Sequence, residues 1–318
     1  MDFKVALPII ISFAISVILS PIFIPFLKRL KFGQYVRDEG PQSHLKKSGT
    51  PTMGGIIILL SIVVTCLFYM KGHKDIIPIL FATVGFGIIG FCDDYIKVVM
   101  KRSMGLKPWQ KMIGQIVVTG VFAYYIANYS SVNTELLIPF SGGKYWDISF
   151  MWIPLLFFVF LGTTNGANFT DGLDGLASSV TVLIATFFTV VAMGLKSDIT
   201  PITGAVMGSL LGFLVFNAYP ARVFMGDTGS LALGGFVAST AYMLQMPLFI
   251  LIVALVYLVE VLSVIIQVTY FKATGGKRIF KMAPIHHHFE LCGWPETKVV
   301  TMFSIATAIL CVIGLLAI

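Results

Sequence analysis

The sequence predicts an all-α fold: a polytopic membrane bundle of about ten transmembrane helices, with both termini on the extracytoplasmic side. Hydrophobic residues make up 57% of the 318-residue chain and charged residues only 12%, whereas a soluble domain carries about 25% charged residues. The apolar segments approach the roughly 20 residues that a membrane-spanning helix needs, and they are far longer than barrel strands. Because backbone polar groups in lipid must be satisfied within the chain, these segments are expected to be helices.

Ten apolar segments account for the predicted helices. The first, at 5–26, could be mistaken for a signal peptide, but it contains Pro8, Pro21 and Pro25 and lacks a small-residue cleavage site, so a retained span is expected. The four cysteines show no paired spacing, which disfavours a disulfide or zinc framework. In chain order, the predicted spans are 5–26, 53–70, 76–92, 112–129, 150–167, 175–194, 201–217, 230–245, 248–271 and 299–318.

The basic residues divide unequally between the loops on the two sides of these spans. The loops at 27–52, 93–111, 168–174, 218–229 and 272–298 carry 17 of the 22 lysines and arginines. Cytoplasmic loops are enriched in such residues, so these loops are expected to face the cytoplasm and both termini to lie outside. The positive charge is then a topology signal rather than a surface for nucleic acid. No internal repeat or low-complexity linker is visible, so residues 1–318 are expected to form one domain.

Four short polar segments interrupt the apolar chain, and all four fall in or beside the predicted cytoplasmic loops. Clustered ionisable groups at the edges of membrane spans are costly and usually functional. Loops that converge on one face could therefore form a shared cleft. A transporter would place its site near the membrane midplane, where this sequence has only Glu260, either a proton relay or a hydrogen-bonded helix contact. The polar segments are 91–97, 168–175, 225–230 and 283–290.

The first polar segment combines two adjacent carboxylates with a lysine. On a helix, Lys97 follows Asp93 by four residues and Asp94 by three, so its ammonium group can reach either carboxylate. Adjacent carboxylates at an interface suit metal binding or general-base chemistry, and the lysine would offset their repulsion or bind a phosphate. The alternative interpretation is a salt bridge that anchors the helix at the membrane interface.

The second and third polar segments combine aspartates with glycines. Two Asp-Gly steps at 171–175 favour tight turns, and Asp174 is expected to cap the following helix. Such a turn could hold a base, a sugar or a metal-bound phosphate, or it could be purely structural. Asp227 precedes the predicted span at 230–245, where a helix N-terminus favours anions and an aspartate suits a hard cation. Taken alone, this last motif also fits an ordinary helix cap.

The fourth polar segment contains three consecutive histidines, His286, His287 and His288. Consecutive residues cannot share one helix face, so a single transition-metal site is less favoured than a loop of hydrogen-bond donors. Histidine titrates near neutrality, and four basic residues lie just upstream at 272–281. The segment is therefore suited to an anionic substrate.

These residue types together are typical of phosphoryl transfer at a membrane surface. Carboxylates hold Mg²⁺, which usually binds substrate phosphates as well. Mg²⁺ and lysines neutralise the charge that develops when a phosphoryl group moves, and the apolar body gives access to a lipid. The residues therefore predict phosphoryl transfer from a soluble phosphate donor to a lipid acceptor.

Five motifs resemble those of the phospho-N-acetylmuramoyl-pentapeptide transferase family, within the polyprenyl-phosphate N-acetylhexosamine-1-phosphate transferase superfamily. The resemblance covers nearly the whole chain, through residues 49–55, 93–97, 168–175, 220–229 and 284–290. The paired aspartates and the Asp-Gly turns are shared across the superfamily. The triple histidine is the family signature and separates it from a sister transferase that uses UDP-N-acetylglucosamine. Phe169 stands where the family commonly has leucine.

The resemblance implies a ten-span, homodimeric enzyme of the bacterial inner (cytoplasmic) membrane. Such an enzyme moves phospho-N-acetylmuramoyl-pentapeptide from UDP-N-acetylmuramoyl-pentapeptide to undecaprenyl phosphate, forming lipid I and UMP with Mg²⁺. By position, Asp93, Asp94, Asp227 and His287 would be catalytic, with Asp227 as the metal ligand and Asp93 as the base. The implied substrate-binding residues are Lys46, Lys97, Lys111, Asn168, Asp171, Gly172, Leu173, Asp174, Asn217, Phe224, Gln267, His286 and His288.

Overall fold

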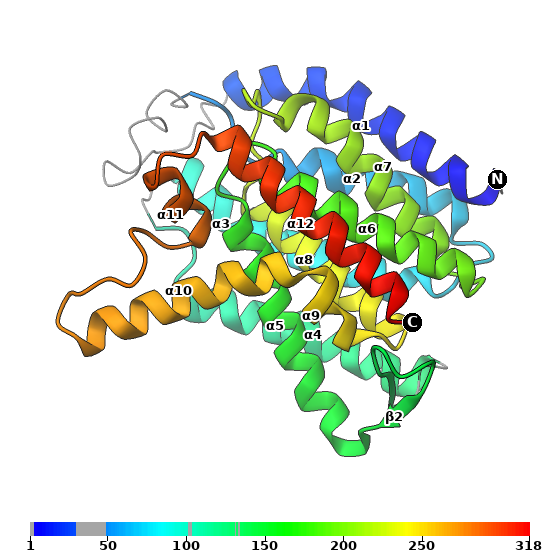
Figure 1. The fold of residues 1–318 in the computed structure, drawn as a ribbon. Helices are drawn as coiled ribbons and strands as arrows, with labels where there is room; N and C mark the ends of the chain where they lie inside the picture. The colour runs from blue at the N-terminus through cyan, green and yellow to red at the C-terminus, as the bar shows by residue number, and fades with distance from the viewer. Residues whose placement is uncertain (1–2, 30–48, 101–103, 131, 133) are drawn as a thin grey trace.

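The structure of the protein, a computed structural model, describes residues 3–29, 49–100, 104–130, 132 and 134–318. Within these residues the chain is almost entirely helical, as predicted (Figure 1). The long helices are α1 (Phe3–Arg29), α2 (Gly55–Tyr69), α3 (Ile76–Val98), α4 (Pro108–Tyr129), α5 (Trp152–Thr170), α6 (Leu176–Gly194), α7 (Thr200–Asn217), α8 (Gly226–Met243), α10 (Leu255–Ala273) and α12 (Glu296–Leu316). The shorter elements are the strands β1 (Glu135–Leu137) and β2 (Tyr145–Asp147), the 3-10 helices η2 (Ser149–Met151) and η3 (Pro247–Phe249), and the helices α9 (Ile250–Val253) and α11 (Ile285–Leu291).

The long helices lie at the positions of the predicted spans, which confirms a polytopic membrane bundle. In the described part of the chain, eight of them are long and apolar enough to cross a membrane. The other two are α2, with 15 residues, and α8, which is buried from Thr228 to Met243. The start of α1 and the end of α12 lie at the same end of the bundle (Figure 1). That this end is extracytoplasmic stays a prediction from the loop charges.

Helix α8 packs between its neighbours at positions where only glycine fits. A side chain at Gly90 of α3 would collide with the carbonyl group of Asp227, and one at Gly55 of α2 would collide with the amide of Gly229. Small residues of this kind let helix backbones approach closely in membrane proteins. As a consequence, the ends of α2 and α3 are held directly against the first turn of α8.

The predicted span at 248–271 is wrong as a single helix. The chain there forms η3 and α9, leaves helical geometry at Ala254 (φ −110°, ψ 27°), and restarts as α10. Helix α10 then projects away from the rest of the bundle (Figure 1). The segment is apolar on both sides of Ala254 and has neither glycine nor proline at the break, so hydropathy alone merges the two helices.

A β-hairpin, which the sequence did not predict, fills the connection between α4 and α5. Strands β1 and β2 pair antiparallel, with Leu136 opposite Trp146. Leu136 is buried while the Trp146 side chain is 60% exposed. The amide of Phe140, in the hairpin turn, donates to the carbonyl of Ala317 at 2.8 Å, which ties the hairpin to the end of α12.

Candidate active site

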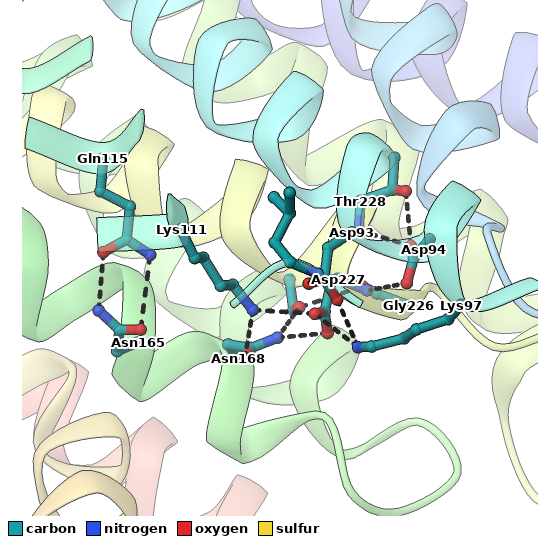
Figure 2. Close-up of polar contacts among 12 residues, drawn as sticks. Asp93, Asp94, Lys97, Lys111, Gln115, Asn165, Asn168, Gly226, Asp227 and Thr228 are labelled. Carbon is teal, nitrogen blue, oxygen red and sulfur yellow. Dashed lines mark hydrogen bonds and ion pairs between the residues drawn. The ribbon is translucent and has the colours of Figure 1, made fainter. Parts of the chain in front are cut away.

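Four helix ends that are distant in sequence bring the predicted charged residues together (Figure 2). Three of the residues, Asp93, Asp94 and Lys97, come from the last turns of α3. Lys111 comes from the start of α4, Asn168 from the end of α5, and Asp227 from the first turn of α8. The close helix packing at Gly55 and Gly90 therefore positions an acidic cluster at one end of the bundle.

Asp94 caps the N-terminus of α8. Its carboxylate accepts hydrogen bonds from the amides of Asp227 (3.2 Å) and Thr228 (2.9 Å) and from the Thr228 hydroxyl (2.6 Å). The first amides of a helix are a natural anion site, and here a carboxylate from α3 takes it. The sequence placed Asp227 in a loop before the helix, whereas α8 begins at Gly226. A phosphate therefore cannot use these two amides while Asp94 holds them.

Asp93 is fixed by its own set of contacts. Its Oδ1 accepts from the amide of Leu106 at 2.8 Å, in the connection before α4. Its Oδ2 pairs with the Lys97 ammonium, which confirms the contact predicted from their four-residue spacing. The same ammonium reaches Asp227 Oδ2 at 3.0 Å. Lys97 therefore bridges the two carboxylates, and Asp94 has no part in that contact.

Asp227 lies at the centre of the cluster. Its Oδ2 also accepts from the Lys111 ammonium at 2.8 Å, and its Oδ1 accepts from the Asn168 amide at 2.8 Å. The Asn168 amide also donates to the Ser230 hydroxyl at 2.8 Å. Two ammonium groups and one amide thus stabilise the ionised carboxylate.

The three carboxylates form the one candidate cation site in the part of the chain that the structure describes. One oxygen from each of Asp93, Asp94 and Asp227 lies within 4.8 Å of the others. Hard oxygen donors of this kind fit Mg²⁺, and three carboxylates against two ammonium groups leave a net negative charge. Within the described chain, Asp94 is bonded only to the amides and the hydroxyl of α8, whereas Asp93 and Asp227 share the Lys97 ammonium. Because the Lys97 side chain is 40% exposed, the shared side of Asp93 and Asp227 is the more accessible to a cation.

A second polar layer lies beside this cluster, and the sequence interpretation missed it. Gln115 of α4 and Asn165 of α5 exchange side-chain amide hydrogen bonds of 2.9 and 3.5 Å (Figure 2). They lie one helical turn from Lys111 and Asn168, and the Lys111 ammonium donates to Asn168 Oδ1 at 3.4 Å. The sequence spacing could have indicated this layer. Gln115 follows Lys111 by four residues and Asn165 precedes Asn168 by three, which places each pair on one helix face. A pair of amides inside a membrane bundle needs such mutual bonding.

The Asp-Gly turn is built differently from its prediction. Asp174 does not cap α6; the cap position belongs to Gly175, whose φ of 77° suits glycine. The Asp174 carboxylate instead accepts from the Ala221 amide at 2.8 Å, and its own amide donates to Glu296 at 2.6 Å. Asp174 therefore joins three segments, the turn after α5, the segment after α7 and the start of α12.

Asp171 lies at the start of this turn, outside the membrane-spanning segments. Burial, and then the charges of Asp227 and Asp94, raise its pKa well above the ordinary value of an aspartate. The amide of Gly226 acts in the opposite direction, because it stabilises the ionised form. Asp171 thus links the acidic cluster electrostatically to the Asp-Gly turn.

Asn217 and Phe224 shape the segment that precedes α8. The Asn217 amide donates to the Val223 carbonyl at 2.9 Å and accepts from the Ser178 hydroxyl at 2.7 Å. Phe224 pairs through its backbone with the glycine-rich segment before α2: its amide donates to the Pro51 carbonyl at 2.9 Å, and its carbonyl accepts from the Gly54 amide at 2.8 Å. Both residues thereby hold the segment that leads into α8.

The histidine segment is a short helix, α11, and not the predicted loop. Its three rings have different partners: His286 contacts Glu260 at 3.1 Å, His287 contacts Glu290 at 2.7 Å, and the His288 Nδ1 accepts from the Lys281 amide at 3.1 Å. That the three histidines do not share one metal stays a prediction.

Gln267 and Leu173 complete the predicted residues that the structure describes. Gln267 bonds the backbone of Ile279 and Phe280, and Leu173 is buried within the Asp-Gly turn. Gly172 lies against the ring of His286, so the Asp-Gly turn and the histidine helix are in contact. Lys46 lies outside the described residues.

Comparisons with known proteins agree with these motifs. The model of glycosyl transferase family 4 matches residues 76–245, and phospho-N-acetylmuramoyl-pentapeptide-transferase signature 1 matches residues 47–59. A phospho-N-acetylmuramoyl-pentapeptide-transferase of Clostridium botulinum (strain Alaska E43 / Type E3) is 53% identical, covering 97% of this chain and 95% of its own. Proteins of the same name from Acetivibrio thermocellus (53% identical; 97% and 93% covered) and Clostridium kluyveri (49% identical; 99% of each covered) are similar over the same length.

Proposed function

The chain belongs to the phospho-N-acetylmuramoyl-pentapeptide-transferase family, and we propose that it transfers phospho-N-acetylmuramoyl-pentapeptide from its UDP carrier to undecaprenyl phosphate. The products are lipid I and UMP, an early step of peptidoglycan synthesis. The observation that carries the proposal is the cluster of Asp93, Asp227, Lys97 and Lys111 at the end of a membrane bundle. An active site in that place can receive a soluble nucleotide and a membrane lipid together.

The proposed reaction is a single in-line displacement. An oxygen of the lipid phosphate attacks the phosphorus that carries the sugar, and the bond from that phosphorus to the UMP oxygen breaks. A phosphate monoester is a sufficient nucleophile near neutral pH, because its second pKa is about 6. Asp93, held by Leu106 and Lys97, would accept the proton of any monoanionic acceptor and orient its phosphate.

The lysines are suited to the charge that develops on the phosphates. Lys97 and Lys111 both contact Asp227 Oδ2, at 3.0 and 2.8 Å. Fixed cations beside a transferring phosphoryl group stabilise the transition state without reorganisation. Lys111 also donates to Asn168 at 3.4 Å, and its side chain is 17% exposed against 40% for Lys97.

We propose Mg²⁺ as the metal, held by Asp227, while Asp93 serves as the base. When bound, it would neutralise charge on the transferred phosphoryl group. Asp94 would act indirectly, since its oxygens hold the first turn of α8 and so fix the direction of Asp227. The Asp-Gly turn with Phe224 would receive the uridine, and the histidine helix would select the muramoyl-pentapeptide donor. A catalytic role of His287 is proposed from the family resemblance alone.

The proposed location is the bacterial inner membrane, with the site on the cytoplasmic face, where UDP-linked precursors are made. The excess of basic residues in the loops at this end supports that orientation. A homodimer is proposed from the family resemblance alone.

The direct test is UMP release by the purified protein in lipid nanodiscs with Mg²⁺ and undecaprenyl phosphate. We expect release with UDP-N-acetylmuramoyl-pentapeptide and none above background with UDP-N-acetylglucosamine. The opposite preference would assign the chain to the sister activity. Without the lipid, we expect neither UMP release nor a protein that carries the labelled sugar phosphate, because a single displacement needs the acceptor. A sugar-phosphate adduct trapped on an aspartate would contradict the displacement and indicate a covalent intermediate.

A further inference from the structure

Helix α10 carries a buried polar stripe on an otherwise apolar surface. Glu260, Ser263 and Gln267 are at most 8% exposed, while Val259, Leu262 and Ile266 beside them are about 40% exposed. The spacings of three, four and seven residues place the stripe on one face. Polar side chains within a membrane span are costly and usually serve a function, so the stripe calls for an explanation beyond packing.

The stripe holds the histidine segment at two points. Gln267 Oε1 accepts from the amides of Ile279 and Phe280, both at 3.0 Å, and its Nε2 donates to the Phe280 carbonyl at 3.0 Å. Two turns earlier, Glu260 Oε1 contacts His286 Nδ1 at 3.1 Å, and both side chains are completely buried. The first contact fixes the loop before α11, and the second fixes the first turn of α11 itself.

The ring of His286 lies directly against Gly172 of the Asp-Gly turn. Any side chain at position 172 would collide with the Nε2 atom of this ring. Glycine is therefore required there for the histidine helix and the turn to touch. The position of the His286 ring consequently sets how the two proposed donor-binding segments face each other.

The Glu260–His286 pair is a single contact between two buried side chains. Among the described residues, neither His286 Nε2 nor Glu260 Oε2 has a hydrogen-bond partner. A relay needs a further donor or acceptor on each side, whereas a contact that only orients a ring does not. The contact on which the inference rests is the one that orients the His286 ring.

We propose that Glu260 is a positioning residue for the nucleotide-sugar donor: it holds His286 against Gly172 and so places α11 beside the Asp-Gly turn. This inference rests on the proposed function, because it takes the two segments as the donor site. The ligand class is a nucleoside diphosphate sugar. Glu260 acts through hydrogen-bond geometry, and its charge is not required.

Steady-state kinetics with three variants test this role. Glu260→Leu should raise the KM for UDP-N-acetylmuramoyl-pentapeptide about tenfold, the usual effect of losing one buried hydrogen bond, with little change in kcat or in the lipid KM. Glu260→Gln should stay near wild type, because its amide oxygen still accepts from Nδ1. Ser263→Ala, whose hydroxyl bonds only the Glu260 carbonyl, is the matched control on the same stripe and should also match wild type.

Two outcomes would overturn the inference. If Glu260→Gln lost as much activity as Glu260→Leu, the charge or a proton transfer would be the requirement. If Glu260→Leu lowered kcat and left the donor KM unchanged, Glu260 would serve the chemical step and not donor binding.

A thermal-unfolding cycle tests the contact without any turnover. Glu260→Leu and His286→Leu should each lower the Tm of the nanodisc-embedded protein, and the double variant should fall little further, because both remove one interaction. If the double variant lost as much Tm as the two single variants together, the Glu260–His286 contact would be contradicted. Absence of UMP release by the wild-type protein would instead refute the proposed function, while this cycle still reported on the Glu260–His286 pair.

Discussion

Replacing Asp94 tests whether this carboxylate is a structural cap or a chemical base. In Asp94→Asn, the amide oxygen can keep the two bonds from Thr228, but the new amide group meets the Asp227 amide, donor against donor. A buried unsatisfied donor costs about 1–3 kcal/mol, and a lost bond to a charged group about 1.5–3 kcal/mol. These two figures describe the same lost bond and are not added, so we expect Asp94→Asn to lower the free energy of unfolding by about 2–3 kcal/mol.

The assay is thermal unfolding of the nanodisc-embedded variant, followed by intrinsic fluorescence. At about 2–4 °C per kcal/mol for chains of this size, Asp94→Asn should lower Tm by roughly 4–12 °C. Thr228→Val removes only the hydroxyl bond to Asp94 and serves as the graded control, with an expected loss of about 1 kcal/mol. An Asp94→Asn protein that has lost activity but keeps the wild-type Tm would refute the capping role.

Three further predictions concern neighbouring groups. Lys111→Met should lower kcat about 10²–10³-fold, the usual effect of removing a group that stabilises transition-state charge; an effect on KM alone would contradict this role. Gln115→Leu should lower Tm and activity, and the exchanged pair Gln115→Asn with Asn165→Gln should recover both, since their amide bonds join α4 to α5; no recovery would mean that the pair does not set the helix contact. Because burial and the charges of Asp227 and Asp94 raise the pKa of Asp171, its ionised form costs stability above that pKa, and stability rises as pH falls through it. Asp171→Asn should therefore raise Tm more at alkaline than at acidic pH, and an equal gain at both would contradict the assignment.

The helices could be predicted from the sequence because lipid imposes a strong rule on apolar segments. Local spacing also predicted the contact of Lys97 with Asp93, four residues away. Hydropathy could not locate the break at Ala254, since a bend supported by tertiary packing needs no glycine or proline. The β-hairpin was missed because its strands have only three residues each.

The composition of the site was more predictable than its bonding. The sequence indicated Asp93, Asp94 and Asp227 as one group. It did not indicate that Asp94 would cap α8, because Asp94 and Thr228 are 134 residues apart. The same limit applies to Glu260, whose partner His286 lies on a helix that was expected to be a loop. Such contacts depend on how helices pack, and single-sequence spacing carries no information about that.

The most direct test of the proposed active site is UMP release by Asp227→Asn in the same nanodiscs, at saturating donor, lipid and Mg²⁺. Asp227 is the carboxylate on which Lys97, Lys111 and Asn168 converge, and it is the proposed metal ligand. A loss of kcat of about 10³-fold, measured below the Tm of the variant, is the predicted result for a group that acts on the transition state. Turnover within tenfold of wild type would contradict the claim that this cluster performs the transfer.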